Sequence, residues 1–191
     1  MAIIPRLRNT QPSPGTTHGS KGGVITWIEK NLDRKLHWLI CQINTNELML
    51  RKLIEVLDGK TDSKTGFSNP LGKMLMKVNT MKPNFNFEPI NIGPDLIVLP
   101  ADIVKDLSTD QNLLYLLCKA VRTGYLPPDV AQRKPGAIVH SRWLTTAETF
   151  LKLYMSEIDL DEELKDRLKI IVTFIVSDYA PMWFQLKVKN S

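Results

Sequence analysis

Glycine, serine and lysine gather in residues 13–23, "SPGTTHGSKGG", and these residue types build phosphate-binding loops. The P-loop pattern G-x-x-x-x-G-K-[ST] spaces its glycines so that backbone N–H groups surround the phosphates. Here only three residues separate Gly15 from Gly19, a serine stands before Lys21, and Gly22 replaces the hydroxyl that would hold magnesium. The spacing therefore argues against a nucleotide site.

Metal ligands and nucleophiles are equally weakly supported. The histidines His18, His37 and His140 are scattered, and none stands at ligand spacing from a cysteine or carboxylate. Cys41 and Cys118 lie far apart in apolar runs, which predicts two buried thiols in a reducing compartment rather than a disulfide. We therefore predict no metal, no cofactor and no catalytic residue.

Basic residues are unevenly distributed in a chain of net charge +5. Residues 60–82 contain five lysines against Asp62, and residues 119–142 contain five Lys or Arg residues against Asp129. Such clusters attract polyanions through counterion release, although a solvated lysine-rich surface is the alternative. The predicted nucleic-acid-binding residues are Lys60, Lys64, Lys73, Lys77, Lys82, Arg133, Lys134, Arg142 and Trp143.

The pair Arg142 and Trp143 permits two interpretations. An arginine beside a tryptophan at a helix start could hold a phosphate next to a stacking ring. A buried tryptophan beside a salt bridge is the simpler alternative. Both remain open from the residues alone.

The elements that must position these residues are mainly helices. Asn44 with Glu47, and Ser108 with Gln111, have the spacing of capping boxes, and Gly59 stands where a helix would end. Apolar periodicity predicts helices over 24–32, 45–57, 71–78, 109–122, 141–156 and 161–180.

Strands are expected at one or two places. The apolar run 35–41, "KLHWLIC", is typical of a strand covered on both faces, and 95–100, "DLIVLP", is either a second strand or a packing segment. Pro181 is expected to interrupt the last helix, and the aromatic residues around it indicate a surface that packs against further chain. The predicted fold class is mostly α with one or two short strands, and residues 1–20 are expected to be loose.

The composition also bears on location. No apolar stretch of signal-peptide length occurs near Met1, and no run approaches the roughly 18 apolar residues of a membrane span. We therefore expect a nuclear or cytoplasmic protein without a membrane partner.

Four segments in order resemble a known family. They are "KGGVITWIEKNLDRKLHWLICQINTNELMLRKLIEVLDGKT", "FSNPLGKML", "HSRWLTTAETFLKLYMS" and "FIVSDYAPMWFQLK". Over about residues 20–189 this order resembles transposon-derived proteins of arthropods, nematodes and insect viruses. More remotely it is similar to hAT-superfamily transposases, whose catalytic domain is RNase H-like. The resemblance implies a partial RNase H-like α/β scaffold with a helical insertion, making residues 21–191 a transposase-like domain fragment.

The resemblance also implies that catalytic acids are missing. Asn44 replaces the histidine of a Cys-x-x-His segment that begins at Cys41, and Pro14 stands where a catalytic aspartate is expected. No acid precedes Glu29, and the other family acids would fall outside the chain. A lone acid such as Asp58 would not hold the paired metal ions of the family chemistry. A truncated, non-catalytic protein is therefore expected.

The expected function is weak, non-specific nucleic-acid binding through residues 60–82 and 119–142. The alternative is a protein-interaction module or non-functional transposon relic. It would associate with a second copy or a host protein through its apolar C-terminal segment.

Overall fold

The computed structural model describes residues 24–34, 42–60, 69–93, 96, 98–135 and 142–189. The chain forms two compact units, Met1–Ile40 and Cys41–Ser191, whereas the sequence placed a boundary at residue 20. In the first unit, helix α1 spans Val24–Leu32, as its periodicity predicts. The expected loose segment 1–20 and the expected strand 35–41 lie outside the described residues.

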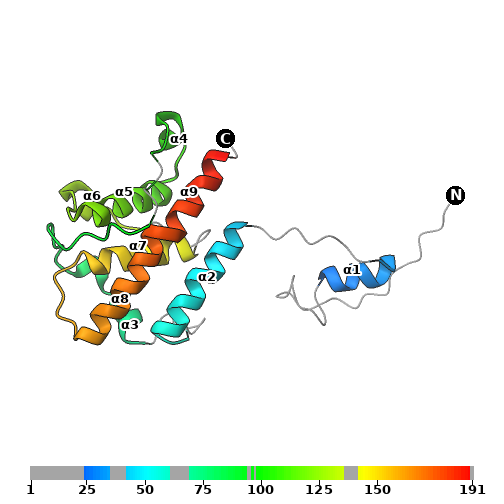
Figure 1. Cartoon of the computed structure of the whole chain (residues 1–191), viewed down its shortest axis with the longest axis horizontal. Helices are drawn as coiled ribbons and strands as arrows, with labels where there is room; N and C mark the ends of the chain where they lie inside the picture. The colour runs from blue at the N-terminus through cyan, green and yellow to red at the C-terminus, as the bar shows by residue number, and fades with distance from the viewer. Residues whose placement is uncertain are drawn as a thin grey trace. The chain divides into compact units, whose positions relative to one another are not determined.

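Helices make up most of the described part of the second unit (Figure 1), which confirms the mostly α prediction. A 3-10 turn, η1, spans Val78–Thr80, and a π-helical turn, η2, spans Ile175–Tyr179. The α-helices are α2 (Gln42–Leu57), α3 (Pro70–Leu75), α4 (Ala101–Lys105), α5 (Thr109–Thr123), α6 (Pro128–Gln132), α7 (Arg142–Tyr154), α8 (Glu162–Phe174) and α9 (Ala180–Lys189).

The core lies where α7 packs against α5 and α8. Helices α8, η2 and α9 follow one another as one long column, and α2 packs alongside it (Figure 1). The predicted apolar stripes face this core: Leu50 and Ile54 of α2, and Leu144 and Leu151 of α7, are fully or almost fully buried. The apolar residues at helical spacing are therefore buried in the core, as in amphipathic helices.

Residues 95–100 do not form a strand in their described part. Leu99 is buried, and its N–H lies 3.4 Å from Tyr115 Oη, so the run is the packing segment that the sequence left as the alternative. Within the described residues, strand-like pairing is limited to two isolated bridges, Pro83 with Ser156 and Asn86 with Tyr125.

Helix α5 begins and ends as its sequence predicts. The Ser108 side chain accepts from the Gln111 N–H and the Gln111 side chain accepts from the Ser108 N–H, which completes a capping box. Gly124 then closes the helix with φ 72°. A Cβ at Gly124 would lie 2.8 Å from the Phe87 oxygen, so this glycine also allows a close backbone approach.

Helix α2 differs from its prediction at the start. It begins at Gln42, so Asn44 lies inside the helix rather than at its N-cap. At the other end, Gly59 follows with φ 93°, as expected for a helix stop.

The α-helical run is interrupted just before Pro181, as the sequence predicts: α8 ends at Phe174, the π-helical η2 follows, and Pro181 lies in the first turn of α9. Proline lacks an N–H and its ring clashes with the carbonyl of an ordinary helical turn. The wider turn of η2, just before Pro181, resolves this conflict: Ala180 N–H bonds to Ile175 O, a π-helical spacing. The aromatic residues beyond it are used within the chain, since Phe184 is fully buried against Tyr115 with ring centroids 5.3 Å apart.

Candidate nucleic-acid interface

The described lysines of the first basic cluster lie at or just after the ends of α2, α3 and η1. Lys60, Lys73 and Lys77 are exposed. Lys82 is also exposed, and its Nζ lies 2.8 Å from Glu157 Oε2. Among the described residues, Lys73 and Lys77 form no ion pair with a carboxylate, whereas the charge of Lys82 is partly neutralised.

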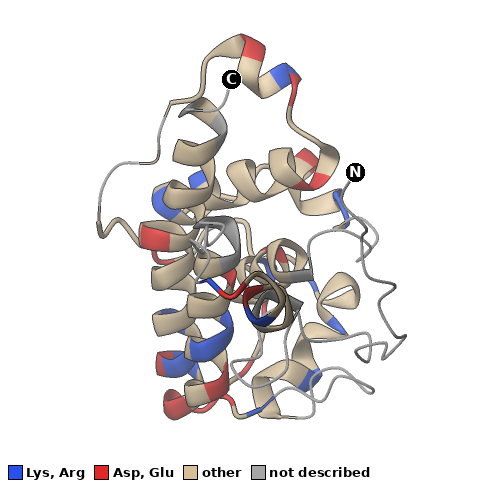
Figure 2. Ribbon diagram, turned by 90° about the vertical axis from the view of Figure 1, so that its right-hand side faces the viewer, with Lys and Arg blue, Asp and Glu red and all other residues tan. Residues whose placement is uncertain are grey.

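The second basic cluster also contains one residue that is paired with a carboxylate and one that is not. Arg133 lies 3.7 Å from Asp129 and donates to Asn112 Oδ1 at 3.0 Å, so its guanidinium is engaged within the protein. Lys134 is exposed and has no carboxylate partner in the described part of the chain. Figure 2 shows that basic and acidic residues are interspersed on the ribbon. The ion pairs of Lys82 with Glu157 and of Arg133 with Asp129 therefore leave fewer cations free to bind a ligand.

The Arg142–Trp143 pair opens α7. Trp143 is half-buried and packs against the core, which favours a structural role for its ring. Lys64 and the side chain of Arg142 lie outside the described residues, as does the glycine-rich stretch 13–23.

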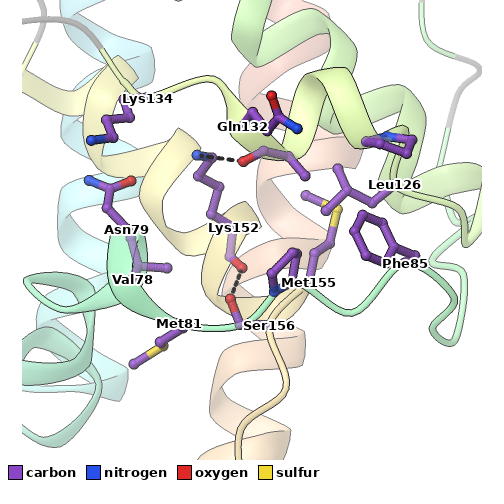
Figure 3. A pocket seen from close by; sticks show the side chains of 13 residues that line it. Val78, Asn79, Met81, Phe85, Leu126, Gln132, Lys134, Lys152, Met155 and Ser156 are labelled. Carbon is purple, nitrogen blue, oxygen red and sulfur yellow. Dashed lines mark hydrogen bonds between the residues drawn. The ribbon is translucent and has the colours of Figure 1, made fainter.

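A pocket of about 300 Å³ lies beside the C-terminal half of α7 (Figure 3). Its walls come from η1, the segment after it, α6 and α7. The lining is mainly apolar, and none of the lining residues is acidic. The apolar side chains that the pocket displays include Val78, Met81, Phe85, Leu126 and Met155.

Backbone hydrogen bonds fix the wall that carries Phe85. Asn84 N–H donates to Met155 O at 2.8 Å, and Leu126 N–H donates to Phe85 O at 3.0 Å. Phe87 N–H donates to Gly124 O at 3.1 Å. These bonds tie one segment to the ends of both α5 and α7, although the sequence around it, "MKPNFNFEP", has no helix or strand pattern.

Lys152 of α7 supplies the pocket's central cation. Its Nζ donates to the oxygens of Ala131, at 3.5 Å, and of Arg133, at the C-terminal end of α6. Burial lowers the pKa of Lys152; the ionised form of Glu148 opposes this effect, and the charge of Lys134 adds to it. The repulsion between the two ammonium groups would be relieved by an anion bound between them.

Sequence reasoning found Lys134 but missed Lys152 and Phe85. Lys152 stands alone between Leu151 and Leu153 in a helical apolar run and belongs to neither basic cluster. Only the packing of α6 against the end of α7 brings it beside Lys134, so no local signal marked it.

Asp58, the lone acid considered above, has a structural role. Its two carboxylate oxygens each accept a backbone N–H, from Leu71 and Gly72, at 2.9 Å. The side chain is buried, and it caps the N-terminus of α3 from across the preceding loop.

Buried ionisable groups occur near the middle of the core. Burial and the charge of Asp110 raise the pKa of Glu148 to about 9, so its carboxyl group is neutral at pH 7. Burial also raises the pKa of the Cys118 thiol, which leaves it un-ionised and a poor nucleophile. Among the described residues, no group of three or more His, Cys, Asp or Glu residues is arranged to hold a metal ion.

A second hollow, of about 490 Å³, lies between α2 and the α8–η2 column. It is lined by Leu53 and Phe174 together with charged residues of both signs. Ile170 in its lining is 49% exposed, and Val56, three residues after Leu53 on α2, is 68% exposed. This hollow combines apolar residues with charges of both signs, so it lacks the cationic character of the α6–α7 pocket.

Comparisons with known proteins supply no family for the chain. Neither protein-family models, nor curated proteins, nor solved structures give a match. In the described part of the chain, no helix has the length and apolar character needed to cross a membrane. The transposase-like resemblance and the nuclear or cytoplasmic location therefore stay predictions.

Proposed function

We propose that this chain binds nucleic acid weakly and without sequence specificity through the surface around the α6–α7 pocket. The observation that carries the proposal is the convergence of Lys134 and Lys152 on a pocket without an acidic lining residue. Nucleic acid is the polyanion that such unneutralised cations attract through counterion release.

We propose that Lys73 and Lys77, which precede the pocket in the chain, contribute to the same phosphate-binding surface. Lys77 directly precedes Val78 and Asn79, which line the pocket. With Lys134 they are exposed and free of carboxylate partners among the described residues. Cations on α3, on the segment after it and on the segment after α6 are therefore available to contact a phosphate backbone.

The origin of the chain belongs to the same proposal. The order of the sequence motifs supports a transposon-derived, non-catalytic protein with a partial RNase H-like scaffold. Such a relic would retain contacts to the phosphate backbone without cleaving it. Its location would be nuclear or cytoplasmic.

The test is fluorescence anisotropy with a labelled oligonucleotide over a range of salt concentrations. The double variant Lys73→Glu/Lys77→Glu is expected to weaken binding strongly. The matched control Lys52→Glu/Lys105→Glu changes the net charge equally at exposed sites on α2 and α4. Absence of binding by the wild-type protein even at low salt would exclude the proposed function.

Protein association is the second candidate. The surface that favours it is not the apolar C-terminal segment that the sequence suggested. Phe184 is buried and Trp183 packs against the core, so these aromatic side chains contribute to intramolecular packing. Two exposed apolar residues, Ile170 in the lining of the α2–α8 hollow and Val56 on α2, are the better sites for self-association. Sedimentation at increasing concentration, with Val56→Lys as the variant, tests this candidate.

A further inference from the structure

We infer that the α6–α7 pocket accepts a single unpaired base, so that the protein prefers single-stranded to double-stranded nucleic acid. This inference rests on the proposed function, because the surrounding lysines would hold the strand whose base enters the pocket. It adds to the proposed function a ligand class, single-stranded nucleic acid, and a binding mode, insertion of one base, that charge alone does not specify.

The size and lining of the pocket fit one base. About 300 Å³ is at the lower limit of sites that bind small molecules, which are roughly 300–1,000 Å³. Val78, Leu126 and Met155 provide a buried apolar floor, with exposures of 4%, 3% and 1%. Phe85 is 39% exposed and thus presents part of its ring to a ligand. Bases stack on such rings whatever their identity.

The polar groups are separated from the ring. In Figure 3, Lys134 and Asn79 lie on one side, Phe85 and Leu126 lie on the opposite side, and Lys152 lies between them. A base stacked at Phe85 would therefore leave its phosphate on the side of the lysines. This separation of aromatic ring and cations is the arrangement of single-strand binding grooves.

Hydrogen bonds hold the Lys152 ammonium in a position from which it could contact the phosphate. Carbonyl oxygens of Ala131 and Arg133 accept from its ammonium, which fixes its position and leaves a third N–H for an anion. The wall carrying Phe85 is fixed as well, because the Phe85 oxygen accepts from Leu126 N–H at 3.0 Å. Little ordering is then needed on binding.

The rim can contact base edges without selecting one base. The carboxamides of Gln132 and Asn79 each offer donors and an acceptor, and both side chains are exposed. Exposed carboxamides can turn to suit different base edges, which favours tolerance of sequence. A base inside a duplex is stacked and paired, and would have to leave the helix before it could enter.

The experiment compares three labelled probes by fluorescence anisotropy. They are a single-stranded oligonucleotide, a single strand of the same length whose sites are abasic, and the duplex. The abasic probe keeps the phosphates and removes the bases. We expect wild-type protein to bind the single strand roughly tenfold more tightly than the abasic strand, as expected for one stacked base. We also expect it to bind the single strand more tightly than the duplex.

Phe85→Ala should remove this preference while leaving affinity for the abasic strand unchanged, and Phe85→Trp should retain it. Ile92→Ala is the matched control, because Ile92 is an exposed apolar residue outside the pocket. Thermal unfolding of each variant establishes that it is folded.

Three outcomes separate the inference from the proposed function. Equal wild-type affinity for the base-containing and abasic strands would overturn the inference and leave the proposed function intact. A preference that survives in folded Phe85→Ala would overturn the assignment of the pocket. Absence of binding to all three probes would overturn both.

Discussion

The guanidinium of Arg122 donates a hydrogen bond to the main-chain oxygen of Val176, with 2.9 Å between Nη2 and the oxygen. Val176 lies in η2, where the N–H of Ala180 bonds to Ile175 O. The same spacing would pair the Val176 oxygen with residue 181, but Pro181 has no N–H. Arg122 of α5 therefore donates the hydrogen bond to the Val176 oxygen that the backbone at Pro181 cannot donate.

Replacing Arg122 by methionine should lower the free energy of unfolding by about 1.5–3 kcal/mol, the range for a hydrogen bond from a charged donor. Urea unfolding followed by circular dichroism measures the change. In a double-mutant cycle, Pro181→Ala restores an N–H near the Val176 oxygen, so Arg122→Met should cost less in that background. An equal cost in both backgrounds would show that Pro181 does not create the need for Arg122.

Local signals in the sequence predicted the parts of the fold that depend on neighbouring residues. The Ser108 and Gln111 capping box formed as expected, because its two partners lie within one turn of the chain. The stripe containing Leu50 and Ile54 was predictable because burial follows helical spacing.

The features that sequence reasoning missed depend on residues far apart in the chain. Arg122 compensates for Pro181 across the core, and Lys152 joins Lys134 only because the end of α7 packs beside α6. Lys82 was equally basic in sequence, yet Glu157 pairs with it in the fold. The charge pattern therefore predicted a basic surface but not which cations are available on it.

Removing the Asp58 carboxylate should destabilise α3. Asp58→Ala loses both acceptors for the Leu71 and Gly72 N–H groups, and the expected loss is about 1–2 kcal/mol in unfolding free energy. Asp58→Asn keeps one acceptor oxygen and should lose less. The measurement is urea unfolding of the two variants beside wild type, and equal losses for both would exclude the two-acceptor explanation.

Glu148 should make stability fall as the pH rises. Its folded pKa is about 9, whereas the unfolded chain has a value near 4.5, so the folded state binds more protons between these limits. Stability from the neutral carboxyl is fully present below pH 4.5 and is lost progressively up to pH 9. The expected slope is roughly 1.4 kcal/mol per pH unit, or roughly 2–3 kcal/mol between pH 6 and pH 8.

Glu148→Gln provides the control for this pH dependence, because glutamine has a similar shape and does not titrate. Its unfolding free energy should vary less than that of wild type from pH 6 to pH 8, and it should exceed wild type at pH 8. Parallel curves for the two proteins would mean that groups other than Glu148 cause the pH dependence.

Removing the Lys134 charge should change the salt dependence of nucleic-acid binding as well as its strength. If the Lys134 ammonium contacts a phosphate, Lys134→Gln removes one counterion-releasing contact. The slope of log K against log salt for a single strand should then become shallower by about 0.7. Lys105→Gln is the matched control, since Lys105 is exposed on α4 and does not line the pocket. Anisotropy titrations at several salt concentrations give both slopes. An unchanged slope for Lys134→Gln would place the phosphate path elsewhere on the protein, even if the wild-type protein binds.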